Sequence, residues 1–240
     1  MAEQRTGMDR LRSLAWANRR LIILAACAIV FVALLEDVLA GDLIRIDQAA
    51  YALIVERLRA EWLTPIMESV SALATPVSLI VMLLVIVAFA PGKRPGACCA
   101  VNLVLVFALN QLLKLIIQRP RPEGFALAVE QGFSFPSGHS MVAMAFFGLL
   151  AWMVWRYETD RATRIGCVAA FGTVAVLVGV SRIYLGVHYA SDVIAGFCVS
   201  LAWLAVYTRV AAPLFLGPAP ARTSADERPL QENGSVRSQS

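Results

Sequence analysis

The chain of 240 residues contains only two histidines, and each stands in a short polar stretch between apolar segments. His188 is followed four residues later by Asp192, so on a helix the two side chains would share a face. A carboxylate that accepts a hydrogen bond from one imidazole nitrogen fixes the tautomer and makes the other nitrogen a better nucleophile or base. The pair therefore indicates nucleophilic or acid–base chemistry, although His and Asp also occur at membrane interfaces without catalysis.

His139 has a different setting, because it ends the stretch "PSGH" directly before another apolar run. The free N–H groups and the dipole at the start of a helix make a natural anion site. Gly138 leaves room for an approaching oxyanion, and Ser137 offers a hydroxyl. A simple helix cap explains the Ser-Gly step equally well. Spacing alone leaves open which of the two histidines is the nucleophile.

Three basic residues accompany the histidines: Lys114, Arg121 and Arg182. The planar fork of arginine suits phosphate oxygens, whereas lysine acts as a point charge. A single basic residue near a membrane is more often an interfacial anchor. Pro120 and Pro122 stop the helix that carries Lys114, so we expect Arg121 to lie on a rigid turn that returns toward the site.

Together these residues form an anion cradle that holds two histidines, an arrangement suited to phosphoryl transfer. Arg119 can either face the same site or anchor to lipid headgroups. The polar clusters lack the spacing of metal ligands, and a site rich in Lys and Arg repels divalent cations. We therefore expect neither a metal ion nor another cofactor.

The elements that position these residues are apolar. Hydrophobic residues make up 59% of the chain and charged residues 16%, and the mean hydropathy is +0.68, values typical of a membrane protein. A spanning helix needs about 20 mainly apolar residues. Six stretches qualify or nearly do so: residues 21–40, 64–90, 95–117, 139–155, 164–181 and 191–210. The first lacks the cleavage site of a signal peptide, so we expect it to be retained. The predicted fold is all-α, an integral membrane bundle of six transmembrane helices, since helices satisfy their own backbone in lipid.

Charge placement predicts the orientation of the bundle. Basic residues concentrate near the N-terminus and in the loops at 91–96 and 156–164, whereas residues 36–61 hold six acidic and three basic residues. The positive-inside rule then places both termini in the cytoplasm and the polar clusters on the outer face. The basic N-terminus serves as a topology signal and lipid contact, and a nucleic-acid role is not expected.

The expected organisation has three parts. Residues 1–20 form a cytoplasmic segment, residues 21–213 the six-helix membrane domain, and residues 214–240, rich in Pro, Ser, Arg and Glu, a disordered cytoplasmic tail. Within the membrane domain, the amphipathic stretch 44–62 is expected to lie along the outer membrane surface.

Three sequence motifs carry a family resemblance. "KLIIQRPRP", "PSGH" and "SRIYLGVHYASD" resemble the signature motifs K-x6-RP, PSGH and SR-x5-H-x3-D of the type 2 phosphatidic acid phosphatase superfamily, which also includes vanadium haloperoxidases and bacterial acid phosphatases. All three motifs are complete and in order between Lys114 and Asp192. The six-span layout with the motifs outside is similar to the membrane branch of that superfamily.

The resemblance implies a role for each motif residue. His188 would attack phosphorus to give a phosphohistidine, with Asp192 orienting it, and His139 would protonate the leaving oxygen and then activate water. The residues implied to hold the phosphate are Lys114, Arg121, Ser137, Gly138, Ser181 and Arg182.

The predicted function is a metal-independent lipid phosphate or diphosphate phosphatase at the extracytoplasmic side of the plasma (inner) membrane. Its expected partners are the lipid bilayer and a membrane lipid phosphate, and its oligomeric state is left open. From the bacterial membrane members of the superfamily that the chain resembles, undecaprenyl diphosphate is the leading expected substrate, followed by phosphatidylglycerophosphate and phosphatidic acid. The alternatives are a vanadate-dependent haloperoxidase, a lipid phosphotransferase and a non-catalytic lipid-binding or transport protein.

Overall fold

The computed structural model describes residues 18–41, 45–90, 92 and 94–217 of the chain. Every regular element within these residues is a helix, which confirms the predicted all-α class for this part. Most of the predicted N-terminal segment at 1–20 and of the predicted tail at 214–240 lies outside the described residues.

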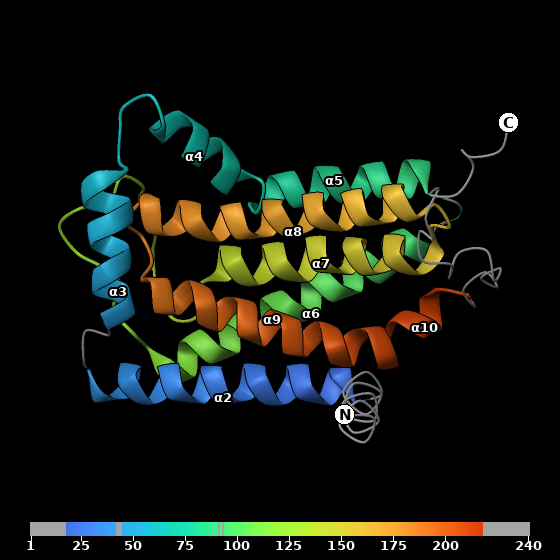
Figure 1. Ribbon diagram of the computed structural model, residues 1–240, viewed down its shortest axis with the longest axis horizontal. Helices are drawn as coiled ribbons and strands as arrows, with labels where there is room; N and C mark the ends of the chain where they lie inside the picture. Colours follow the sequence, from blue (N-terminus) through green and yellow to red (C-terminus); the bar gives the residue numbers. More distant parts are fainter. Residues whose placement is uncertain (1–17, 42–44, 91, 93, 218–240) are drawn as a thin grey trace, which may run out of the picture.

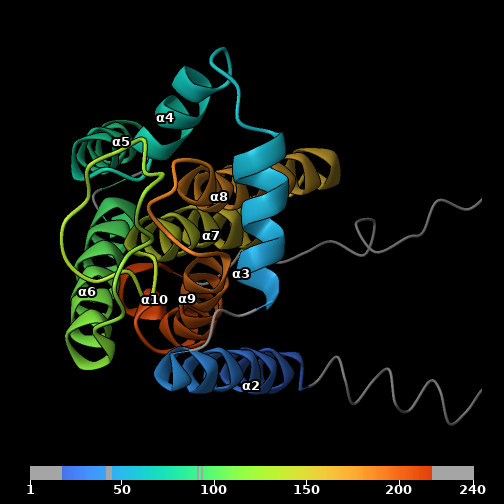
Figure 2. The ribbon, with the colours of Figure 1, turned by 90° about the vertical axis from the view of Figure 1, so that its left-hand side faces the viewer.

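Among the residues that the structure describes, five helices are long and apolar enough to cross a membrane. They are α2 (Arg19–Ala40), α6 (Arg94–Ile117), α7 (Gly138–Tyr157), α8 (Arg161–Tyr184) and α9 (Ala190–Val210). Figure 1 shows them running lengthwise through the molecule, and in Figure 2, where they are seen closer to end-on, α7 lies among α6, α8 and α9. The α2 helix packs on α9. The middle position of α7 explains its many buried apolar side chains, including Met141, Phe146 and Leu149.

The predicted span at residues 64–90 is broken into two helices. The α4 helix (Thr64–Ala72) and α5 (Pro76–Phe89) meet at 55°, so the described residues hold five candidate spans, or six if this pair counts as one. Pro76 supplies the reason, because proline cannot continue a preceding helix and forces the residue before it into an extended conformation. Thr75 is accordingly extended, with φ −74° and ψ 153°.

The amphipathic stretch forms α3 (Arg45–Ala50) and a wider π-helical turn, η1 (Tyr51–Arg57). In Figure 1 this segment runs across one end of the bundle. Ile46 and Leu53 are exposed, whereas Asp47 is buried against the bundle. The short α10 (Ala212–Phe215) follows α9 and extends two residues into the predicted tail.

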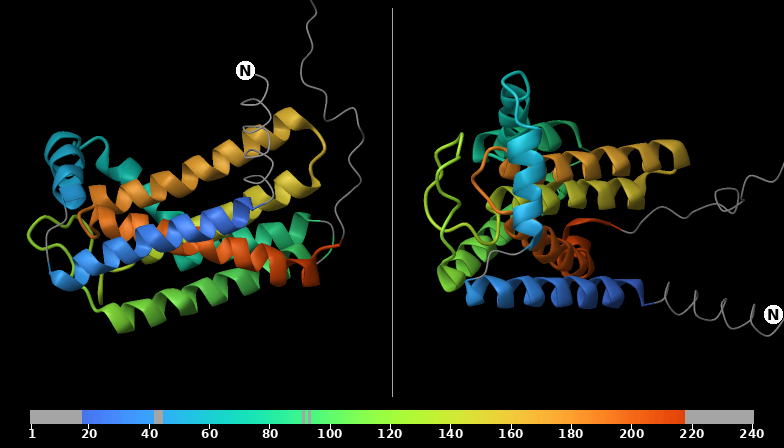
Figure 3. Two further views of the ribbon diagram at one scale, coloured as in Figure 1. Left: turned by 60° about the horizontal axis from the view of Figure 1, so that its bottom comes forward. Right: turned by 60° about the vertical axis from the view of Figure 1, so that its left-hand side comes forward.

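The three motifs meet at the end of the bundle that α3 crosses. The α6 and α8 helices end there, and α7 and α9 begin there, as the two views of Figure 3 also show. Two connections close this end: residues 118–137 between α6 and α7, and residues 185–189 between α8 and α9. Segments far apart in the sequence are thereby brought together, as predicted.

Candidate active site

His188 and Asp192 are in contact at the start of α9. Nδ1 of His188 lies 3.2 Å from Oδ2 of Asp192, and both side chains are buried. His188 precedes the helix, so the contact is made across its first turn; the same carboxylate oxygen accepts the backbone N–H of Tyr189. Gly186 makes the tight turn from α8 possible: its φ is +72°, and a Cβ there would lie 2.7 Å from the carbonyl oxygen of Phe125.

Arg121 faces the other nitrogen of the His188 ring. Its Nη1 lies 3.2 Å from Nε2 of His188 and donates to the carbonyl oxygen of Val187 at 3.0 Å. Nε and Nη2 donate to the carbonyl oxygens of Gly132 and Gln131 at 3.0 and 3.1 Å. Three backbone carbonyls therefore fix the guanidinium, and the predicted return of Arg121 toward the site is confirmed.

The surroundings of His188 favour a neutral ring. Burial lowers the pKa of His188 to about 4, and the hydrogen bond and charge of Asp192 offset only part of that effect. With Nδ1–H donated to Asp192, Nε2 carries the lone pair and accepts from Arg121. The arrangement thus places a buried, oriented ring nitrogen with a lone pair beside a fixed cation.

Arg182 adds a second arginine from the last turn of α8. Its Nη1 donates to Oγ of Ser71 on α4 at 2.6 Å, and its Nη2 forms an ion pair with Oε1 of Glu130. The other oxygen of Glu130 lies 3.7 Å from Nη2 of Arg121. Burial raises the pKa of Glu130, but the charges of Arg182, His139 and Arg121 outweigh it and the net shift is downward, so the carboxylate is ionised.

Lys114 and His139 lie along the wall of one cavity of about 510 Å³, together with Arg121, Glu130 and Gly138. Nζ of Lys114 donates to the carbonyl oxygen of Phe133 at 2.8 Å. The cavity continues along apolar side chains of α5 and α6, which are Leu79, Leu103, Phe107 and Leu115. It is therefore polar and cationic at one end and apolar along its length.

The residues of "PSGH" begin α7 as the sequence suggested. Oγ of Ser137 accepts the backbone N–H and the hydroxyl of Ser140, at 3.4 and 2.9 Å. The backbone N–H of Ser137 donates to the carbonyl oxygen of Asp192 at 3.0 Å, which ties the starts of α7 and α9 together. A Cβ on Gly138 would lie 3.0 Å from Oδ1 of Asn110, so glycine allows this close approach of α6.

Ser181 is placed differently from the other predicted residues. Its hydroxyl donates to the carbonyl oxygen of Val178 at 2.7 Å, within α8, and the side chain is buried. The hydroxyl proton is thus directed into the helix rather than toward the cradle.

Arg119 points inward, which decides between the two alternatives left by the sequence. Its Nη1 lies 2.6 Å from Oδ1 of Asp192, and its guanidinium stacks over the ring of Tyr189 at 4.0 Å. Sequence reasoning missed two further acidic residues at this end of the bundle, Asp47 and Glu130. Both lie outside the three motifs. The sequence offers only a weak signal for each: Asp47 stands in the acidic stretch before the second span, and Glu130 stands in the connection between the first two motifs.

The sequence of this chain matches a known protein family. The model of the PAP2 superfamily matches residues 95–215, and the chain belongs to that superfamily. The chain is 35% identical over 150 residues to phosphatidylglycerophosphatase B of Bacillus subtilis (strain 168), covering 60% of this chain and 73% of that protein. It is 36% identical over 125 residues to lipid A 1-phosphatase of Rhizobium johnstonii, covering 48% of this chain and 47% of that protein.

A solved structure resembles the whole bundle. It is the crystal structure of a transmembrane PAP2-type phosphatidylglycerolphosphate phosphatase from Bacillus subtilis, with a TM-score of 0.64 and 26% identity. The match covers 80% of this chain and 96% of that one. Together with the long apolar helices, this similarity identifies the chain as a membrane protein.

Proposed function

We propose that this chain hydrolyses the phosphomonoester headgroup of a membrane lipid through a phosphohistidine at His188. The enzyme class, a phosphatase, is confirmed by membership of the PAP2 superfamily and by the phosphatases among its relatives. One observation carries the proposed chemistry: Nε2 of His188 faces Arg121 while Asp192 holds Nδ1.

The proposed reaction has two steps. In the first, Nε2 of His188 attacks phosphorus, the bond to the lipid oxygen breaks, and His139 gives that oxygen a proton. In the second, His139 takes a proton from water, the resulting hydroxide attacks phosphorus, and the N–P bond breaks to release phosphate. Both histidines then return to their starting states, so atoms and charges balance.

Positive charge in the cradle supports this chemistry. Lys114, Arg121 and Arg182 can neutralise the phosphate oxygens in the transition state. In the described part of the chain, no group of three or more His, Cys, Asp or Glu is placed to hold a metal ion. We therefore propose that the three cations serve in hydrolysis without a divalent metal or other cofactor.

The cavity at His139 supports a lipid substrate. Its cationic end suits a phosphate, and its walls of Leu79, Leu103 and Phe107 suit a hydrocarbon tail. Phe107 is 54% exposed on the outside of the bundle, where lipid would surround it. We propose that the tail stays in the bilayer while the headgroup reaches the cradle.

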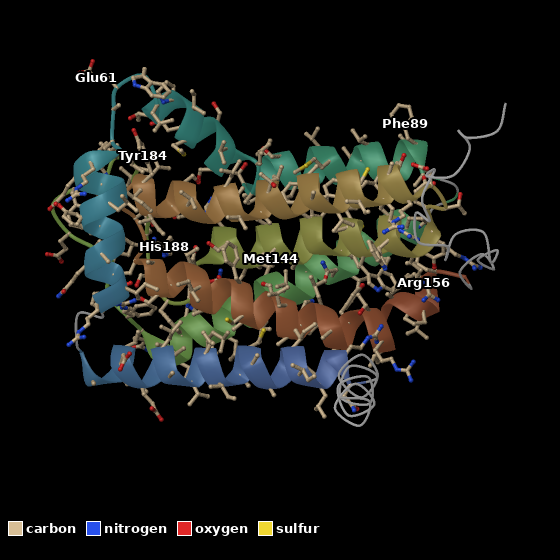
Figure 4. The ribbon with its side chains drawn as sticks, in the orientation of Figure 1. Glu61, Phe89, Met144, Arg156, Tyr184 and His188 are labelled. Carbon is tan, nitrogen blue, oxygen red and sulfur yellow. The ribbon has the colours of Figure 1, made fainter. Side chains whose placement is uncertain are left out.

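The charges at the opposite end support an extracytoplasmic active site. Arg94, Arg156 and Arg161 lie at the ends of α6, α7 and α8 away from the motifs, and Figure 4 shows Arg156 at the far end from His188. By the positive-inside rule this basic end faces the cytoplasm. We propose a cell (inner) membrane enzyme with α4 and α5 as one of six spans, both termini cytoplasmic, and the predicted three-part organisation of the chain.

The substrate itself calls for a direct comparison. The names of the Bacillus relatives favour phosphatidylglycerophosphate, and the undecaprenyl diphosphate expected from the sequence stays a prediction. Purified protein in excess chelator should release phosphate from phosphatidylglycerophosphate, phosphatidic acid or undecaprenyl diphosphate, assayed side by side, and vanadate should inhibit. A strict divalent-metal requirement would contradict the mechanism, and vanadate-dependent halide oxidation or phosphate transfer to an added alcohol would favour the alternative activities.

A further inference from the structure

A continuous line of buried charged groups leads from the surface helix α3 to the nucleophile. Oδ2 of Asp47 lies 3.0 Å from Nη2 of Arg119, and Nη1 of Arg119 lies 2.6 Å from Oδ1 of Asp192. The other oxygen of Asp192 holds Nδ1 of His188. The four side chains are exposed by no more than 9%. These contacts are therefore made away from bulk solvent.

Asp47 also holds the first turn of α9. Its Oδ1 accepts the backbone N–H of Ser191 at 2.8 Å, and its Oδ2 accepts the hydroxyl of Ser191 at the same distance. Nη1 of Arg119 donates to Oγ of Ser191 at 2.7 Å. The carboxylate of Asp47 on α3 thus binds two residues that position Asp192: Arg119, which pairs with it, and Ser191, which precedes it.

The geometry points to Asp47 as a positioning residue for the nucleophile, a role that rests on the proposed function of His188. With Asp47 in place, Arg119 is shared between two carboxylates and Asp192 keeps one oxygen for His188. Without the charge of Asp47, a buried arginine has only Asp192 as its ionic partner and draws it away from the imidazole. The orientation of His188 then depends on the docking of α3 across the end of the bundle.

The test uses the two-histidine composition of the chain. In protein labelled with ¹⁵N-histidine, the hydrogen-bonded Nδ1–H of His188 should give a downfield proton resonance, which a His139→Gln background assigns. We expect Asp47→Asn to lose or shift this resonance and Asp47→Glu to restore part of it. Glu61→Gln is the matched control, because Glu61 is exposed and points away from the bundle in Figure 4.

Kinetics supply the second readout, in the native His139 background. We expect Asp47→Asn to lower kcat by about 10- to 100-fold, the range for residues that orient a reacting group through another, with KM within about threefold. Should Asp47→Asn fail to fold, Arg119→Lys keeps the buried charge but lacks the planar fork whose two nitrogens contact Asp47 and Asp192 separately, and the same losses are expected. An unchanged His188 resonance in a folded Asp47 or Arg119 variant overturns the positioning role of Asp47, whether or not the wild type hydrolyses a lipid phosphate. A wild type that hydrolyses no lipid phosphate would refute only the proposed function.

A carboxylate of the protein itself, that of Glu130, already lies among the cations of the cradle. The carboxylate of Glu130 pairs with Arg182, lies 3.7 Å from Arg121, and borders the cavity that Lys114 and His139 line. These are the cations proposed to receive the phosphate, and two anions at one set of cations repel each other. We infer that Glu130 is an internal competitor for phosphate, which substrate must displace from the arginines.

Binding of inorganic phosphate and vanadate tests this inference without any turnover. Measured by thermal shift or calorimetry, Glu130→Gln should bind both anions about tenfold more tightly, a change of about 1.4 kcal/mol. Glu123→Gln, an exposed acidic residue in the same connection, is the matched control and should bind as wild type does. Weaker or unchanged binding by Glu130→Gln overturns the inference; weaker binding would mean that Glu130 instead holds Arg182 in place for phosphate.

Discussion

Asp192 holds Nδ1 of His188 at 3.2 Å and so directs Nε2 of the ring toward Arg121. Asp192→Asn is expected to lower kcat by about 10³-fold or more, because an amide can favour the wrong tautomer and no longer stabilises the charged ring. Single-turnover trapping of the phosphoenzyme should show that its formation is the slowed step.

The loss should appear in formation of the phosphoenzyme rather than in substrate binding. Affinity for inorganic phosphate serves as the control for an intact cradle, since Lys114, Arg121 and Arg182 remain. Equal rates of phosphoenzyme formation in wild type and Asp192→Asn would remove Asp192 from the nucleophile's support.

The proposed roles of the two histidines differ in their dependence on the leaving group. His139→Gln should slow hydrolysis of a lipid phosphomonoester by about 10²- to 10⁴-fold, because an alkoxide leaving group needs a proton. With an aryl phosphate, whose leaving group is a weak base, the first step should be slowed much less, and phosphoenzyme should accumulate. Burst kinetics with an aryl phosphate measure this difference.

His188→Ala is the companion variant, and it should form no phosphoenzyme with either substrate. A covalent phosphohistidine in His188→Ala, mapped to His139 by peptide analysis, would reverse the assignment of the two roles.

The sequence predicted the positions of the site residues better than their connections. Hydropathy located the long helices, and Pro120 and Pro122 predicted the return of Arg121. Hydropathy does not predict the bend between α4 and α5, because both halves are apolar enough to pass for one span. The bend follows from Pro76, which begins a new helix. Asp47 and Glu130 carry no local signal, because their partners lie 72 and 52 residues away in the chain and are brought close only by packing.

The pH dependence of activity should reflect the burial of His188. Its pKa is lowered from 6.5 to about 4 by burial, with partial compensation by Asp192. In the proposed mechanism the neutral ring is the nucleophile, so the acid limb of kcat/KM that belongs to His188 should lie near pH 4 and well below 6.5. Histidine NMR titration assigns the limb, and a His188 midpoint at 6.5 or above would contradict the burial argument.

The free energy of unfolding should also depend on the protonation of His188, and it should fall as the pH falls. Between pH 6.5 and about 4 the unfolded chain binds a proton at His188 and the folded chain does not, so the free energy of unfolding falls as the pH falls. Thermal unfolding in detergent should therefore show a larger loss between pH 7 and pH 5 for wild type than for His188→Gln. Equal losses would indicate that His188 is not buried in its neutral form.

The bundle itself contains a buried polar contact that lies outside the site. Nδ2 of Asn102 on α6 donates to the carbonyl oxygen of Ala145 at 2.9 Å, and Nε1 of Trp203 on α9 donates to Oδ1 of Asn102 at 2.8 Å. Asn102→Ala should lower the free energy of unfolding by about 1–2 kcal/mol, since hydrogen bonds between helices in lipid contribute about that much. A double-mutant cycle that combines Asn102→Ala with Trp203→Phe gives the interaction free energy between these two side chains, with unfolding measured in mixed detergent. Additive effects of the two substitutions on the free energy of unfolding would mean that this hydrogen bond does not couple α6 to α9. As a control, the folded fraction of every variant should keep the specific activity of wild type.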